Sequence, residues 1–153
     1  MRLAACVAAF AFVAACGGSS TFSLGDASVD ASYMCPANAR NAAYDVHATI
    51  NAHNNTSKAV TISSVDAVMT VSAVAGVWLQ KAGDRYEAGN VTFTPSIVPA
   101  GSSTKLLVTI PSACSSGKTP TGANYGEYAV SFKVATSSGS FEVSSRNKHR
   151  ILA

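Results

Sequence analysis

Polar and apolar residues alternate along several stretches of this chain. In the clearest stretch, five apolar or aromatic residues from Tyr44 to Ala52 alternate with five polar residues from Asp45 to His53. A period of two over ten residues puts one face of a strand on a core and the other in water. The pattern therefore predicts a half-buried strand at 44–53, followed by a turn at 54–57.

The rest of the chain repeats this signal in pieces that turn-forming residues separate. Strand-forming residues fill 60–79, enough for two or three strands, with a bulge expected at Ser63-Ser64. Further strands are predicted at 91–93, 105–110 and 127–134, the last turning at Ser137-Ser138-Gly139 into Phe141 and Val143. Seven to nine short strands separated by turns indicate an all-β sandwich.

The start of the chain has a different character. Arg2 precedes an apolar run, residues 3–13, that is too short for a membrane span of about 20 residues, and the run ends in Val13-Ala14-Ala15-Cys16. This segment resembles the lipobox of bacterial lipoproteins, in which the cysteine thiol takes a thioether-linked diacylglycerol. The resemblance implies a signal peptide at 1–15 and a membrane anchor, palmitate included, at Cys16. The alternative is an ordinary secretory signal with Cys16 as a spare thiol.

The segment after the lipobox, residues 16–32, begins with Gly17-Gly18-Ser19-Ser20 and has neither helical nor strand period. It predicts a flexible tether, from which Phe22 and Leu24 are the residues able to dock as a short extra strand. The folded domain is expected at 33–153. Without residues 1–15, 138 of the 153 residues remain, a usual length for one domain.

Only two cysteines are then available to form a disulfide. Cys6 leaves with the signal and Cys16 carries lipid, so Cys35 and Cys114 have each other as partners in an oxidising compartment. We expect a disulfide between them. The alternative, two free thiols or half of a metal site, lacks further ligands at zinc-like spacing.

Charge and composition exclude one class of partner. The formal charge of +3 falls to +2 without Arg2, neither strong nor one-sided, so no nucleic-acid partner is expected. Charged residues make up 12% of the chain, against about 25% in an average globular protein. That composition favours β-structure outside the cytoplasm.

One segment carries a resemblance to immunoglobulin-like domains. Asn124-Tyr125-Gly126-Glu127-Tyr128-Ala129-Val130 is similar to the Asp-x-Gly-x-Tyr-x-Cys segment that enters strand F of such domains. The resemblance implies an immunoglobulin-like antiparallel β-sandwich and a tyrosine corner, in which the Tyr128 hydroxyl bonds an upstream backbone group. Val130 replaces the usual cysteine, which implies a divergent, non-antibody type. Trp78 is either plain core or the tryptophan of strand C.

Sequence motifs of known catalytic and metal sites are absent, so neither a catalytic residue nor a cofactor is expected. Asp45, His47 and His53 share the outward face of one predicted strand. The two histidines lie about 20 Å apart, too far for one metal ion, whereas Asp45 and His47 are about 6–7 Å apart and close enough to hydrogen-bond. An ordinary solvated face is the favoured interpretation.

Three cations near the end of the chain, Arg146, Lys148 and Arg150, alternate on the face opposite Phe141, Val143 and Ile151 and are expected about 6–7 Å apart along one strand. One interpretation is protection of an edge strand against pairing with another sheet. The other is contact with an anionic surface such as lipid head groups or cell-wall polymer. Edge protection is favoured, because three charges are few for recognition.

These observations predict a lipid-anchored lipoprotein of the bacterial cell envelope, a non-catalytic binding or envelope-assembly module. Its expected partners are the membrane, through the N-terminal lipid, and an envelope protein or cell-wall polymer. Gly17 differs from the Asp that resembles an inner-membrane retention signal, which favours the outer membrane. The alternative is a small accessory enzyme or carbohydrate-binding protein of the envelope, which polar residues converging on the loops at one end of the sandwich would favour.

Overall fold

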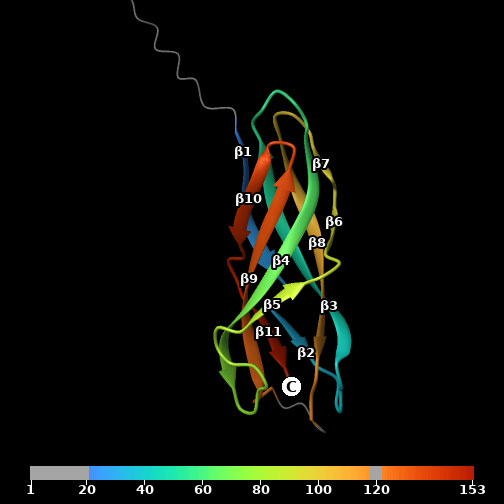
Figure 1. The fold of residues 1–153 in the computed structure, drawn as a ribbon, viewed down its shortest axis with the longest axis vertical. Helices are drawn as coiled ribbons and strands as arrows, with labels where there is room; N and C mark the ends of the chain where they lie inside the picture. Colours follow the sequence, from blue (N-terminus) through green and yellow to red (C-terminus); the bar gives the residue numbers. More distant parts are fainter. Residues whose placement is uncertain (1–20, 118–121) are drawn as a thin grey trace, which may run out of the picture.

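The structure, a computed structural model, describes residues 21–117 and 122–153, which form an all-β domain of two sheets (Figure 1). The predicted signal peptide and lipidated Cys16 lie outside the described residues. No helix is present in those two ranges, and so none that is long and apolar enough to cross a membrane.

The first sheet is antiparallel and contains the strand that the sequence predicts most clearly. Its order is β1 (Phe22–Val29), β3 (Ala42–Asn54), β8 (Ser102–Cys114) and β6 (Thr92–Thr94). β3 and β8 pair along their whole lengths. The inward apolar residues of both strands, among them Val46, Ile50 and Leu106, are buried, and most residues between them are partly or fully exposed, as the period of two predicts.

The second sheet is built on the long pair of β4 (Val60–Ala75) and β9 (Tyr125–Thr136). Beside β9 lie β10 (Gly139–Ser144) and β11 (His149–Leu152), and β2 (Ser32–Met34) pairs in parallel with β11. Beside β4 lie β5 (Arg85–Ala88) and β7 (Ile97–Val98).

The strand order is that of an immunoglobulin-like sandwich. The first sheet follows the order A, B, E, D, with β3 as B and β8 as E. In the second sheet β4 and β9 lie side by side as C and F, and β10 and β11 together take the place of G. The predicted fold class is confirmed.

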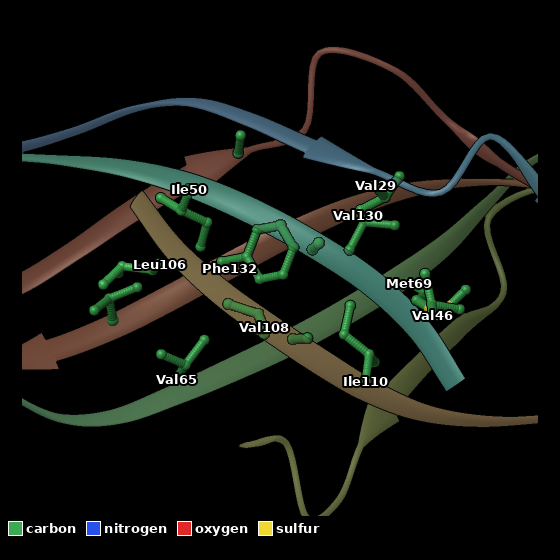
Figure 2. Packing of buried hydrophobic residues seen from close by; sticks show 14 of the residues in the cluster. Val29, Val46, Ile50, Val65, Met69, Leu106, Val108, Ile110, Val130 and Phe132 are labelled. Carbon is green, nitrogen blue, oxygen red and sulfur yellow. The ribbon is translucent and has the colours of Figure 1, made fainter. Parts of the chain in front are cut away.

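Side chains from both sheets meet in a single core. Phe132 of β9 is the largest fully buried side chain, and Figure 2 shows its ring among Ile50, Val108 and Val130. The inward residues of the last predicted hairpin, from Tyr128 to Val134, are buried as expected. Burial of this apolar surface is the main source of stability of the sandwich.

The sandwich begins earlier than predicted. β1 pairs with β3 from Phe22 opposite Asn54 to Val29 opposite Ala48, so the fold starts at Phe22 and not at residue 33. The register shifts between Gly25 and Ser28, and Asp26 has a φ of 50°. This bulge interrupts the period of two, which is why residues 22–29 do not read as a strand.

β4 is one continuous strand of 16 residues and not two or three. Its register against β9 shifts between Ile62 and Ser64, which confirms the predicted bulge, and again between Val71 and Ala73. Both bulges let one long strand follow the twist of the sheet while its inward residues stay buried.

The predicted disulfide between Cys35 and Cys114 is confirmed. It joins the residue after β2 to the last residue of β8, and thus connects the two sheets at one end of the sandwich. We call this the disulfide end. β1 begins beside Asn54 and Ser102 at the opposite end, about 40 Å away along the 13 residues of β3 (Figure 1).

Candidate functional site

Apolar side chains gather in solvent at the disulfide end. Among the described residues, seven large hydrophobic side chains are exposed, and four of them lie at this end: Met34, Val74, Val77 and Leu79. Val77 is 86% exposed and Leu79 is 95% exposed, on either side of the partly buried Trp78. We call residues 76–80, which follow β4, the apolar loop. Met34 and Val74 lie on β2 and β4, with β11 and β9 between them, so the pair Val77 and Leu79 is the candidate for an interaction site.

The apolar loop is held in place by a glycine and an asparagine. Gly76 has a φ of +66°, which a residue with a side chain rarely adopts. The Val77 backbone N–H donates to Asn124 Oδ1 at 2.9 Å, and a Cβ on Gly76 would lie 1.9 Å from the same oxygen. Position 76 therefore requires glycine for both conformation and space.

Trp78 is seated on a second glycine. A Cβ on Gly126 of β9 would lie 2.5 Å from the Trp78 indole, so only a glycine lets the ring lie this close to the strand. The indole thus occupies the place of a side chain at position 126. Trp78 packs against the core, and its neighbours Val77 and Leu79 point away from it.

Tyr128 makes a different contact from the one predicted. Its ring is buried, but its hydroxyl donates to Gln80 Oε1 of the apolar loop and not to an upstream backbone group. The predicted tyrosine corner is therefore wrong, because the loop after β4 folds over the start of β9 and brings Gln80 to the hydroxyl. Burial raises the pKa of Tyr128, and a hydrogen bond with Trp78 acts against that shift.

A groove runs beside the apolar loop. Two hollows of about 500 and 400 Å³ lie side by side and make up the groove, since both linings contain Asn41, Gln80, Ala113, Tyr128 and Ile151. One wall is the apolar loop, and the other is the C-terminal end of β8, from Pro111 to Cys114. Buried core residues lie between the two walls. We call it the disulfide-end groove. The surface of the larger hollow is mainly apolar, as is usual for sites that bind apolar groups, whereas that of the smaller one is about evenly polar and apolar.

Two cations are next in sequence to residues that line the groove: Arg40 precedes Asn41, and Lys81 follows Gln80. Both are exposed, and neither forms an ion pair within the described parts of the chain. The Asp84 carboxylate accepts the Lys81 backbone N–H at 3.0 Å. Across 21–117 and 122–153 no cluster of three or more His, Cys, Asp or Glu side chains suits a metal ion.

The polar face of β3 lies away from the groove. His47 does not pair with Asp45: its Nδ1 and its backbone N–H donate to Asp30 Oδ2, at 3.0 and 2.9 Å. His53 Nδ1 lies 2.8 Å from Ser103 Oγ. The histidines form separate surface pairs and no common site.

The three C-terminal cations do not form the expected row. Residues 145–148 interrupt the strand between β10 and β11, because Asn147 turns back to bond the Val29 carbonyl. Arg146 pairs with Asp26 at 3.0 Å, and Lys148 and Arg150 each contact Glu127 at 2.8 Å. The bonds from Lys148 and Arg150 lower the pKa of Glu127 to about 2. These partners balance most of the charge that an anionic surface would need.

His149 and Asn54 are the two buried polar residues among those described, and the sequence analysis missed both. His149 is 1% exposed, its Nδ1 donates to the Asp30 carbonyl at 2.8 Å, and its Nε2 accepts the Tyr44 hydroxyl at 3.1 Å. Burial lowers the pKa of His149 and raises that of Tyr44. The alternation along the chain does indicate that His149 is buried. His149 and Ile151 share the inward face of β11, and Arg150 points outward between them.

Comparisons with known proteins add little to this site. No protein-family model and no curated protein sequence matches the chain. Among solved structures, it is similar to the ASH/PapD-like domain of human CEP192, PapD-like domain 7, at 13% identity over 84% of each chain with a TM-score of 0.32. The fold assignment rests on the strand order of this chain and not on that likeness.

Proposed function

We propose that this protein is a lipid-anchored, non-catalytic binding module of the bacterial cell envelope that engages a partner protein through its disulfide end. The observation that carries the proposal is the apolar loop, which displays Val77 and Leu79 in water. Asn124 and Gly126 hold that loop before any partner arrives. A preformed surface loses less conformational entropy on binding than a flexible one, so rigid display supports a binding role.

The anchor in this proposal is the lipid on Cys16, six residues before Phe22. β1 enters the sandwich at the end opposite to the disulfide. A lipid attached there leaves the disulfide end as the part of the domain farthest along the sandwich from the anchor, where an envelope protein can reach it. For a cell with two membranes, the Gly17 interpretation favours the outer membrane as the site of that anchor.

The composition of the disulfide end favours a binding module over an accessory enzyme or a carbohydrate-binding protein. Either alternative needs polar or titratable side chains converging on the loops at one end. The loops at this end bring Val77, Trp78 and Leu79 together with uncharged polar residues, of which Asn124, Ser116 and Gln80 are already hydrogen-bonded within the chain. Tyr128 and Tyr86, the titratable side chains that line the groove, already have Gln80 and the Pro111 carbonyl as their hydrogen-bond partners.

Site-specific photo-crosslinking tests the proposal in cells that make the protein. A photoreactive amino acid replaces Leu79, and in a matched control it replaces Leu107, which is 53% exposed on the outer face of β8. We expect protein adducts from position 79 and none from position 107. Adducts of equal yield at both positions, or adducts with lipid alone at position 79, would contradict a protein partner.

A further inference from the structure

Within the described part of the chain, the C-terminal end of β8 is an open sheet edge. On one side β8 pairs with β3 over all 13 residues. On the other side β6 covers residues 107–109 and nothing further. The edge that continues toward Cys114 forms one wall of the disulfide-end groove, where Ala113 lines both hollows.

The direction of the backbone groups on this edge follows from one hydrogen bond. The Tyr86 hydroxyl of β5 donates to the Pro111 carbonyl oxygen at 3.0 Å, so that carbonyl points away from β3. Backbone groups of alternate residues in a strand point to the same side. The N–H and C=O of Ala113 therefore also point away from β3, toward the open edge beside the groove.

The groove thus combines an apolar lining with backbone groups that lack a strand partner. Tyr128 and Ile151 line its base, and Ala113 offers one donor and one acceptor at its wall. A lipid chain would cover the apolar surface but leave those backbone groups without hydrogen bonds, which is costly once water is excluded. An extended peptide satisfies both, since its backbone pairs with the edge and its alternate side chains enter the groove.

We propose that the disulfide-end groove binds an extended segment of a partner protein, which adds to the edge of β8 at Ala113 as a short strand. One or two apolar side chains of the segment enter the groove beside Trp78. Acidic residues flanking them face Arg40 and Lys81. This inference rests on the proposed function and specifies the form in which the partner binds.

A peptide selection tests the inference. The full chain carrying Cys16→Ser, which takes no lipid, is used to select binders from a phage-displayed library of random dodecapeptides. The best binder is then synthesised with an N-methyl group at each backbone position in turn. We expect at least tenfold weaker binding at the one position whose N–H would face the Ala113 carbonyl, and less than twofold change at the neighbouring positions, whose N–H groups point away from β8. A library without binders, or affinity insensitive to N-methylation, would overturn the proposal.

Two substitutions at one position separate the backbone of β8 from its side chain. Ala113→Pro removes the outward N–H, whereas Ala113→Ser keeps it and changes a side chain that is exposed. We expect the selected peptide to bind at least tenfold more weakly to the proline variant and within threefold to the serine variant. Equal affinities for the two variants would refute pairing at Ala113.

Amide hydrogen exchange in the unsubstituted domain makes the test independent of whether the proline variant folds. The Ala113 amide should exchange rapidly in the free protein and at least tenfold more slowly when the peptide is bound. Slow exchange without peptide, or an unchanged rate with it, would show that the edge does not accept a strand.

The two proposals fail in different ways. A protein adduct at position 79 together with peptides that do not protect Ala113 would leave the proposed function standing and remove the strand addition. Backbone-dependent peptide binding without any protein adduct in cells would leave the strand addition standing and remove the proposed function.

Lys81→Gln should also weaken the binding of acidic peptides at low salt about two- to fivefold, since one exposed charge contributes modestly to affinity.

Discussion

At the scale of single residues, the disulfide end depends on glycines whose absent side chains make room for other groups. Gly126 is the clearest case, because the Trp78 indole occupies the volume of its missing Cβ. Nothing in the sequence marks this glycine for such a role. It lies in a motif that resembles strand F of immunoglobulin-like domains, where it would be expected to serve the turn.

We predict that Gly126→Ala destabilises the domain by about 1–3 kcal/mol, the usual cost of overpacking. The added methyl group must push the indole off β9, since strand backbone cannot move without breaking the pairing with β4. Urea unfolding measures the change. Gly89→Ala is the control: a Cβ there meets nothing within 4 Å, so its effect should stay within about 0.5 kcal/mol. Equal effects at the two positions would contradict the packing of Trp78 on Gly126.

The lowered pKa of His149 makes the free energy of unfolding depend on pH, in a range that begins at its ordinary pKa. Burial lowers its pKa in the folded protein, so below the ordinary value of 6.5 the unfolded chain binds more protons than the folded one. Stability must then fall as the pH drops below about 6.5. The loss continues until the pH reaches the lowered pKa of the folded state.

We predict that the free energy of unfolding falls between pH 7 and pH 5, with a contribution from His149 of at most about 1.4 kcal/mol per pH unit. His149→Gln removes the titration, so the stability difference between the two proteins should shrink as the pH falls. Urea unfolding at a series of pH values measures it. A difference that is constant with pH would show that His149 does not titrate in this window. The low pKa of Glu127, about 2, acts in a separate window below its ordinary value of 4.5.

At the scale of elements, the sequence predicts those strands whose two faces differ. β3, β8 and β9 each have one face in the core and one in water, and their period of two is visible without a structure. β1 lacks that signal because its bulge shifts the faces halfway along the strand. The interruption of the strand at 145–148 could not be predicted for a similar reason. The alternation of residues 146–151 continues across a break that Asn147 creates by hydrogen-bonding the Val29 backbone.

The disulfide is the element-level feature with the largest predicted effect. It closes a segment with a sequence separation of 79 residues, which the chain-entropy model equates with about 4 kcal/mol. We predict that reduction lowers the free energy of unfolding by about 2–5 kcal/mol, seen as a lower melting temperature with a thiol reductant. The paired replacement of Cys35 and Cys114 by serine should reproduce the loss and become insensitive to reductant. A reductant effect that persists in that variant would point to another cause.

At the scale of the whole molecule, the candidate site is assembled from segments that the sequence keeps apart. The apolar loop follows β4, the open edge belongs to β8 and Tyr128 belongs to β9. They meet because β4 and β9 are neighbours in one sheet while the disulfide holds the end of β8 to the other. The sequence predicts the fold class and the disulfide, but exposed Val77 and Leu79 look like ordinary strand residues until the loop is seen to leave the sheet.

In the proposed function, a lipid on Cys16 sets the placement of that site relative to a membrane, and the last prediction concerns this residue. Cys16→Ser should move the protein from the membrane fraction to the soluble fraction and abolish labelling with palmitate, because stable attachment needs at least two acyl chains. Cys35 and Cys114, joined to each other, cannot substitute for it. Fractionation of cells and metabolic labelling measure both effects, with the Leu107→Ser variant as a control that should stay on the membrane. If the Cys16→Ser protein still sediments with membranes and the unaltered protein takes up no label, then the anchor is not a lipid on this cysteine. The disulfide end would in that case have to be considered as a membrane contact in its own right.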